Sequence, residues 1–350
     1  MISEDQIRTA LKDVKYPGFN RDIVSFGLVK SVRLDGADIE AQLSLATNDP
    51  KIPAAIHEDA IARLRAIPGA GRVEVRIDIQ APPAAAASAP GPQTIDGVRH
   101  VIAVASGKGG VGKSTVAANL AVALRRAGAR VGLCDCDLYG PSIALMFGAN
   151  ERPTADDDNR IIPINRYGVE LMSMGFLLDD DSPAVLRGPM VTRYTQQFLR
   201  QVAWGELDFL ILDLPPGTGD IQLTIVQTVA LAGVIIVTTP QEVALIDARK
   251  AARMFAKTNV PVLGIIENMS YFLCPSDGVR YDLFGRGGGE REAKRLGVPL
   301  LGEIPIDVAL REGGDVGRPV MEFAAESASG TAFAQIGRMI LEQFSAGIRS

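Results

Sequence analysis

The chain has 350 residues, a net charge of -5 at neutral pH, 47% hydrophobic residues and 22% charged residues. This composition is typical of a soluble globular protein. The acidic balance argues against broad binding to nucleic acid or to anionic membranes, since both need a basic surface. There is no apolar run of about 18 residues and no basic-then-apolar leader, so we expect a cytoplasmic protein without a membrane span. Three cysteines are too few for a disulfide framework.

The first 80 residues predict a small α+β domain. Its expected segments are a helix at Glu4–Val14, strand-like stretches at Ile23–Leu34 and Ile39–Ala46, a helix at Pro53–Ala66 and a strand at Val73–Ile79. Residues 81–94 are rich in alanine and proline, which is typical of an extended linker that packs no core. We therefore expect domains at 1–80 and 95–350, joined by a linker at 81–94.

Residues 95–350 alternate apolar strands and helices. The predicted strands are Val101–Ala105, Arg130–Cys134, Leu207–Leu212, Gly233–Thr238, Val262–Glu267 and Leu300–Ile304. Continuous apolar strands of this kind predict an α/β fold, with a mostly parallel sheet covered by helices on both faces. A final helix at Thr331–Phe344 carries an apolar stripe that we expect to pack on the sheet rather than on a membrane. Ligands of such sheets bind at the carboxyl ends of the strands, where the polar motifs of this chain lie.

A phosphate-binding loop, GKGGVGKST, follows the first of these strands and precedes a helical segment. The strand–loop–helix context makes the motif specific. Its residues are Gly107, Lys108, Gly109, Gly110, Val111, Gly112, Lys113, Ser114 and Thr115. In such loops the backbone N–H groups and the helix N-terminus hold the phosphates of ATP. We expect Lys113 to contact the β and γ phosphates and the Ser114 hydroxyl to ligate Mg²⁺.

Carboxylates follow two other predicted strands. Asp135 and Asp137 lie in the sequence CDCD, where a carboxylate can orient the attacking water or support Mg²⁺. Asp213 ends a hydrophobic strand and fits the acid that holds Mg²⁺ through water, and the Gly217 N–H is placed to sense the γ-phosphate. The cysteines of CDCD suggest a metal pair, but we expect their thiols to point to opposite sides of the strand and to be structural.

The ends of the last two strands complete the candidate nucleotide site. Asn268 can donate to and accept from an adenine edge at once, although an asparagine at this place can equally turn the chain. We group Pro305 and Asp307, which follow the last strand, with Asn268 as nucleotide-binding candidates.

The loop resembles the deviant loop of the MinD/ParA-type dimerising ATPases, which are P-loop NTPases of the SIMIBI class. In that group a second lysine, here Lys108, reaches the nucleotide of the partner subunit. The same resemblance assigns the attacking water to Asp137 and a supporting role to Asp135. We expect catalysis to depend on Lys108, Lys113, Asp137 and Asp213.

Three further blocks narrow the resemblance. RGPM at Arg187–Met190, the run Trp204–Asp220 and ENMSYFLCP at Glu267–Pro275 are similar to the Mrp/ApbC family of iron-sulfur cluster carrier ATPases. The stretch Asp22–Val32 resembles the DUF59, or MIP18-like, domain fused to many members. The resemblance implies a homodimer that binds ATP, hydrolyses it slowly and delivers a [4Fe-4S] cluster to apoproteins. Its expected partners are apo iron-sulfur acceptor proteins and assembly factors, with no nucleic acid and no membrane.

One departure from the family concerns the cluster ligands. Members usually carry C-x-x-C after ENMS, whereas this chain reads Cys274-Pro275-Ser276-Asp277. Two subunits then supply two thiolates, and Asp277 would be a hard oxygen ligand that iron-sulfur clusters rarely use. Three interpretations remain open: labile binding through paired Cys274 thiolates, ligands borrowed from a partner or from glutathione, and action on assembly without holding the cluster.

A second functional class is a MinD/ParA-like positioning switch that binds membrane or nucleoid. It needs a basic or amphipathic docking surface, which the acidic balance disfavours. A nitrogenase-reductase-like electron donor would need two cluster cysteines in each subunit, and Cys274 alone is suitably placed. We expect the glycine-rich run Gly285–Gly289, next to the cysteine loop, to be a flexible connector.

Overall fold

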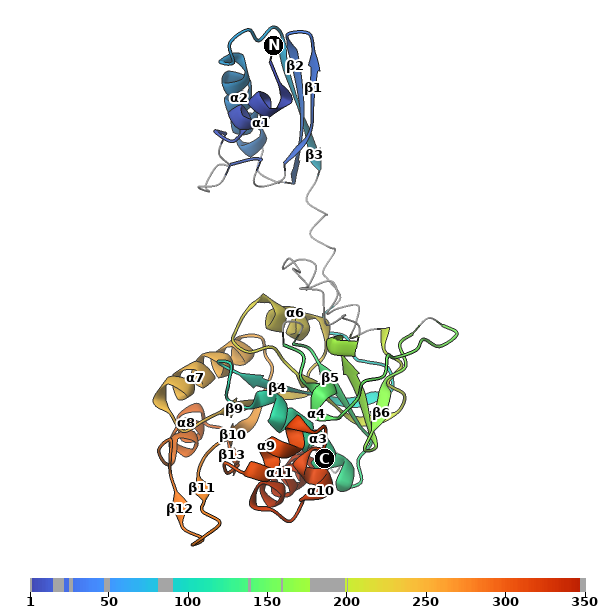
Figure 1. Ribbon diagram of the computed structural model, residues 1–350, viewed down its shortest axis with the longest axis vertical. Coiled ribbons are helices and arrows are strands. Elements are labelled where there is room, and N and C mark those ends of the chain that lie inside the picture. The colour runs from blue at the N-terminus through green and yellow to red at the C-terminus, as the bar shows by residue number, and fades with distance from the viewer. Residues whose placement is uncertain are drawn as a thin grey trace. The chain divides into compact units, whose positions relative to one another are not determined.

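The computed structural model describes residues 2–14, 22–24, 28–46, 51–80, 91–137, 140–158, 160–176, 199 and 201–346. The chain divides into two compact units, Met1–Pro90 and Gly91–Ser350. Figure 1 labels the elements of both units. The block Arg187–Met190 and part of Asp22–Val32 lie outside the described residues.

The small unit is an α+β domain with its own core. Its elements are α1 (Glu4–Leu11), β1 (Val29–Asp35), β2 (Asp38–Ala46), α2 (Lys51–Arg65) and β3 (Val73–Gln80). The strand order is β1-β2-β3, with β1 antiparallel and β3 parallel to β2. Buried residues of the helices, such as Ile7 and Ile56, form one apolar cluster with strand residues such as Leu43. Among the described residues, the strand predicted at Ile23–Leu34 is β1, which begins at Val29.

The remaining elements of the described residues belong to the large unit. Its strands are β4 (Val98–Ser106), β5 (Val131–Asp135), β6 (Ile164–Arg166), β7 (Val169–Ser173), β8 (Leu207–Asp213), β9 (Gly233–Thr238), β10 (Val262–Glu267), β11 (Phe272–Leu273), β12 (Arg280–Tyr281) and β13 (Leu300–Glu303). Its helices are α3 (Lys113–Arg126), α4 (Ile143–Met146), the 3-10 turn η1 (Met174–Phe176), α6 (Asp220–Thr228), α7 (Glu242–Lys257), α8 (Gly288–Leu296), α9 (Val308–Asp315), α10 (Val320–Phe323) and α11 (Ala328–Ala346).

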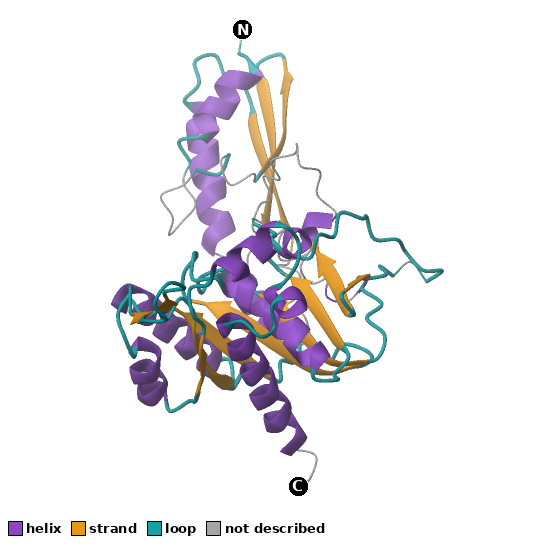
Figure 2. Ribbon diagram, turned by 60° about the horizontal axis from the view of Figure 1, so that its bottom comes forward, coloured by secondary structure: helices purple, strands orange, loops and turns teal. Residues whose placement is uncertain are grey.

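Within the described residues, eight strands form a sheet in the order β13-β10-β9-β4-β8-β5-β7-β6. All neighbouring pairs are parallel except β6 and β7. The chain moves across the sheet in one direction from β4 to β5 and in the other from β9 to β10. Right-handed crossovers therefore place α3 and α7 on opposite faces, and Figure 2 shows the sheet between layers of helices. The predicted parallel α/β architecture is confirmed.

All six strands predicted for the large unit are present. Central strands such as β8 and β9 are apolar runs buried on both faces, whereas the edge strand β13 is only partly buried. The edge strand β6 and its neighbour β7 were not predicted; β6 is short and largely polar. The helix predicted at Thr331–Phe344 is α11, which packs against α3 and β13 through buried residues such as Phe333 and Ile336. Among the described residues, no helix has the length and apolar character needed to cross a membrane.

Candidate functional site

The loop between β4 and α3 lies at the carboxyl end of the central strand. Gly112 caps α3 with φ of 77°, a left-handed conformation that favours glycine. A Cβ atom at Gly112 would lie 2.2 Å from the side-chain nitrogen of Asn268, so the position also needs glycine for space. The loop borders a cavity of about 240 Å³ lined by loop residues together with Asp137, Ser142, Met146 and Pro216.

Lys113 forms a buried ion pair inside this loop. Its Nζ lies 2.5 Å from Asp213 Oδ1, and the side chains are 7% and 0% exposed. The same nitrogen donates to Ser114 Oγ at 3.1 Å. Asp213 Oδ2 is buried and has no hydrogen-bond partner in the part of the chain that the structure describes. Burial raises the pKa of Asp213, and the Lys113 charge opposes that shift. The structure thus brings together the lysine, hydroxyl and carboxylate that the sequence analysis assigned to phosphate and Mg²⁺.

Asp135 lies beside Asp213, because β5 and β8 are neighbours and the two residues are paired in register. Its carboxylate accepts hydrogen bonds from the backbone N–H groups of Asp137, Ser142 and Ile143, at 3.1, 2.9 and 3.1 Å. Burial, and then the charge of Asp213, raise the pKa of Asp135 to about 7. Asp135 therefore organises the chain after β5, while Asp137 lines the cavity of the loop.

The expectation that the thiols of Cys134 and Cys136 point to opposite sides is wrong. Their sulfurs lie 3.9 Å apart, and both side chains are buried. The physical reason is the period of a strand: residues two positions apart share a face. Burial, and then the neighbouring Cys136, raise the pKa of Cys134, which disfavours the thiolate form that binds metals.

Asn268 lies against the loop but bonds to its backbone. Its Nδ2 donates to the Val111 carbonyl at 2.9 Å, and the side chain is buried. The segment after β13 lies next to it, because the Ile306 N–H donates to the Tyr271 carbonyl. Asp307 caps α9 by accepting from the Ala309 N–H at 2.9 Å. In this structure Asn268 thus supports the backbone of the loop, whereas Asp307 supports the start of α9. Pro305, two residues before Asp307, is buried.

Gly217 and Lys108 lie close to the loop in different ways. The Gly217 N–H donates to the Ser106 carbonyl at 3.0 Å, so the segment after β8 is tied to the start of the loop. Lys108 lines the cavity and is partly exposed. Its carbonyl accepts from Ser106 Oγ at 2.9 Å, which fixes the backbone from which the side chain extends.

Cys274 lies in the turn of the β11–β12 hairpin, which projects from the body of the large unit (Figure 1). It is partly exposed, whereas the other two cysteines are buried. Its Sγ lies 3.0 Å from Ser276 Oγ. Asp277 accepts from the Val279 N–H at 2.9 Å, and this bond is the main cause of its lowered pKa. Asp277 therefore shapes the turn that presents the thiol.

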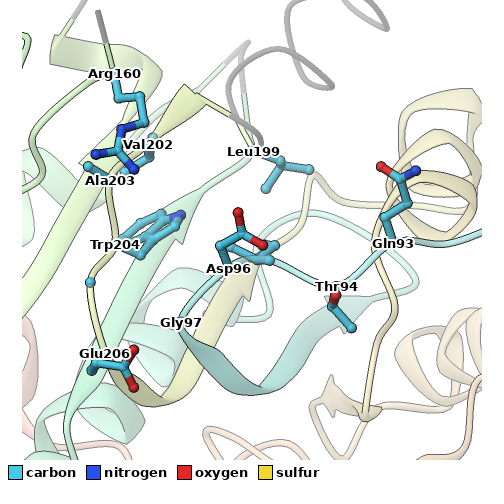
Figure 3. Close-up of a pocket in the computed structure, with 12 residues that line it drawn as sticks. Gln93, Thr94, Asp96, Gly97, Arg160, Leu199, Val202, Ala203, Trp204 and Glu206 are labelled. Atoms are coloured by element: carbon cyan, nitrogen blue, oxygen red, sulfur yellow. The ribbon is translucent and has the colours of Figure 1, made fainter. Parts of the chain in front are cut away.

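A larger cavity, of about 490 Å³, lies at the opposite ends of the strands. Figure 3 shows it between the segments that lead into β4 and β8, with the indole nitrogen of Trp204 facing Asp96. Ligands of parallel sheets bind at the carboxyl ends, so this cavity, despite its size, is not the nucleotide site. The described residues contain no group of three or more His, Cys, Asp and Glu side chains that could hold a metal ion.

A family model described as NUBPL iron-transfer P-loop NTPase matches residues 97–341. The chain belongs to this family. A second model, described as iron-sulfur cluster assembly protein, matches residues 4–77. An iron-sulfur cluster carrier protein of Synechocystis is 45% identical over 345 residues, which cover 97% of each chain. These matches confirm the resemblance to the iron-sulfur cluster carrier ATPases. They also confirm that the chain is a P-loop NTPase.

Two solved structures relate to the large unit of this NTPase. A nucleotide-binding protein from Archaeoglobus fulgidus, in complex with ADP, is 43% identical with a TM-score of 0.58, over 64% of this chain and 88% of its own. The cell division ATPase MinD of Pyrococcus furiosus is 24% identical with a TM-score of 0.54, over 70% of this chain and 99% of its own. The second likeness shows the fold alone.

Sequence reasoning missed two contributors to the site. Glu267 is fully buried at the end of β10, and Ser270 is buried three residues later. The available signal for Glu267 was a glutamate at the end of an apolar strand, because a charge there needs a partner.

The expectation that Gly285–Gly289 is a flexible connector is wrong for its last two residues, since Gly288 and Gly289 form the first turn of α8 and are buried.

Proposed function

We propose that this NTPase is an ATP-dependent carrier that receives an iron-sulfur cluster and transfers it to apoproteins as a homodimer. The observation that carries the proposal is the position of Cys274. It is the most accessible of the three thiols, and its hairpin follows directly on the strand whose next residue, Asn268, bonds to the nucleotide loop.

The described residues fit ATP and Mg²⁺. Asp213 Oδ2 is a buried oxygen that has no hydrogen-bond partner among the described residues, and Lys113 Nζ bonds both to Asp213 Oδ1 and to Ser114 Oγ, so two hard oxygen-bearing side chains lie beside one lysine. Mg²⁺ held there would neutralise charge on the phosphate oxygens. Lys113 would leave Asp213 for the phosphates, Asp137 would orient the attacking water, and Gly217 would sense the γ-phosphate. Asn268, Pro305 and Asp307 would border the base.

Lys108 is proposed to act on the nucleotide of the second subunit. The surface around the loop supports an interface between two copies, because exposed apolar side chains occur on α7 and on the hairpin region. These are Val243, Ile246, Leu273, Val279, Leu283 and Phe284. The α7 backbone at Asp247 packs against Gly107, and Gly288 packs against Pro240, so α7 lies between the loop and the hairpin's exit. Exposed apolar surface marks protein interfaces where it is contiguous, so an interface here requires these side chains to form one patch.

The cargo is proposed to be a [4Fe-4S] cluster held between the two Cys274 hairpins. Cubane clusters generally take four thiolates, and two copies of this hairpin supply two. The remaining ligands would come from an acceptor protein, an assembly factor or glutathione. Such incomplete ligation favours transfer over storage, because fewer protein–iron bonds must break. We assign the small domain at 1–80, joined by the linker at 81–94, to contacts with these partner proteins.

The test is anaerobic reconstitution of the full chain with iron and sulfide. We expect cluster absorption, activation of an apo-acceptor, and loss of both in Cys274→Ser. Cys136→Ser is the matched control, because its thiol is buried and should not contribute. The absence of cluster absorption and acceptor activation in the wild type, with Cys274→Ser behaving identically, would exclude carriage. Light scattering with and without ATP measures the molar mass of the protein in solution and so tests whether it is a dimer.

A further inference from the structure

Four residues connect the nucleotide loop to the cysteine hairpin. Within Glu267–Ser270, Asn268 donates to the Val111 carbonyl of the loop at 2.9 Å. Two residues later the Ser270 N–H donates to the Ile304 carbonyl, and the hairpin begins at Phe272. Met269 between them has φ of 53°, a conformation that is uncommon outside glycine and fixes a sharp change of direction. A displacement of the loop at Val111 therefore reaches the base of the hairpin through very few bonds.

Glu267 joins the two stems of the hairpin. Its Oε1 accepts from Ser270 Oγ at 2.6 Å on the entering stem. Its Oε2 accepts from the Gly289 N–H in the first turn of α8, where the chain leaves the hairpin. A Cβ atom at Gly289 would lie 2.9 Å from Glu267 Oε2, so the approach requires glycine. One fully buried side chain thus holds both ends of the segment that carries Cys274.

This arrangement is costly unless both bonds are made. The first N–H groups of a helix lack partners within the helix, and a carboxylate at that end is favoured by the helix dipole. A buried carboxylate, in turn, is stable only when it is hydrogen-bonded. Glu267 and α8 therefore stabilise each other, and a change at either moves the other.

A second connection runs from the loop to α8. The α7 backbone at Asp247 packs against Gly107 so closely that a Cβ there would lie 2.1 Å from it. On the same helix Arg249 donates to both carboxylate oxygens of Glu292 in α8, at 2.7 and 2.6 Å. The exit of the hairpin is thereby tied to the loop through α7, while its entrance is tied through Asn268.

We propose that Glu267 is a positioning residue, whose bonds to Ser270 and Gly289 transmit the nucleotide state of the loop to the thiol of Cys274. The proposal rests on the proposed function, in which Cys274 is the cluster ligand. Glu267 does not line the cavity of the loop, and it acts through the two stems that it holds. Nucleotide binding shifts Asn268 and α7, and the hairpin follows as one body.

The test measures the rate at which iodoacetamide alkylates Cys274 in the full chain, located by peptide mass mapping. The rate is measured without nucleotide, with MgADP and with a non-hydrolysable ATP analogue. In the wild type we expect it to depend on the nucleotide. In Glu267→Gln an amide nitrogen replaces one carboxylate oxygen and cannot accept the hydrogen bond of its donor, so one of the two bonds is lost. We expect alkylation to be about fivefold faster, which is the factor for one lost buried hydrogen bond. We also expect its nucleotide dependence to be lost while fluorescent ADP still binds.

The matched control is Glu290→Gln, which changes an exposed glutamate in the same turn of α8 whose carboxylate lies 3.7 Å from Lys294 Nζ. It should behave as the wild type. Ser270→Ala removes one of the two bonds and should shift the rate in the same direction, which provides a second variant if Glu267→Gln does not fold.

Two results would overturn the proposal: a wild-type alkylation rate that nucleotide does not change, or wild-type rates and nucleotide dependence in both Glu267→Gln and Ser270→Ala. A wild type that shows nucleotide-dependent alkylation but takes up no cluster would refute carriage and leave the role of Glu267 intact.

Discussion

In this structure Lys113 pairs with Asp213, and in the proposed function it contacts the phosphates of ATP. Replacing Lys113 by methionine removes both interactions, and their loss is measured separately as a loss of stability and a loss of turnover. The change removes the charge but keeps an unbranched side chain. It leaves Asp213, which is fully buried, without its ion-pair partner. Breaking a buried pair from one side costs about 3–5 kcal/mol. We therefore expect Lys113→Met to destabilise the large unit by about this amount and to abolish nucleotide turnover.

The cost should depend on pH, with a sign that follows from Asp213. Burial raises the pKa of this carboxyl, and loss of Lys113 removes the main influence that lowers it. A group whose pKa is higher in the folded state stabilises the fold at low pH and loses that contribution as pH rises through the folded value. Lys113→Met should therefore be more destabilised at pH 8 than at pH 5.5.

Urea unfolding, followed by tryptophan fluorescence, measures the effect. The chain has one tryptophan, Trp204, which is buried in the large unit, so its signal reports on that unit. The double variant Lys113→Met/Asp213→Asn removes both charges and should recover most of the lost stability at pH 8, with nucleotide turnover still absent. Equal destabilisation of the single and double variants would refute the argument, because it would show that the buried charge is not the cause.

Three further changes have defined outcomes. Lys108→Ala should leave ATP binding intact but reduce turnover or dimer closure, and an unchanged rate would remove its action on the second subunit. Asp135→Asn should flatten the pH dependence of stability in urea unfolding. The pKa of Asp135 is raised from 3.8 to about 7, so the contribution of Asp135 to wild-type stability is greatest below about pH 4 and is lost as pH rises toward 7; an unchanged slope in Asp135→Asn would contradict this. Gly289→Ala should lower the melting temperature of the large unit, because the added methyl group meets Glu267. The control Gly285→Ala adds a methyl group with nothing within 4 Å, so it measures only the strain of a non-glycine residue at a positive φ in the local turn.

Local signals predicted the elements that hold the nucleotide loop. The strand before Gly107 is a continuous apolar run, and the glycines and the helix follow within a dozen residues of sequence. Interactions among neighbours in the chain decide such a unit, so the sequence is sufficient for it. The edge strand β6 escaped prediction because it is short, polar and formed by pairing with β7 rather than by its own propensity.

The partners of the polar side chains could not be predicted in the same way. Asp135 and Asp213 are adjacent only because β5 and β8 are neighbours in a sheet where the chain order and the spatial order differ. Asn268 was interpreted from its chemistry as a base reader, and the structure places its amide on the Val111 carbonyl. Chemistry limits what a side chain can bind, but distance selects among the possible partners.

The sequence by itself determined the family, the parallel α/β architecture, the nucleotide loop and the presence of one cysteine after ENMS. These depend on residue type and on short-range spacing, which the chain carries directly. The tertiary structure decided that Lys113 neutralises Asp213, that the CDCD thiols share one buried face, and that Glu267 holds both stems of the cysteine hairpin. Each of these is a contact between elements whose positions follow from packing, where burial makes an unpaired polar group costly and so selects its partner.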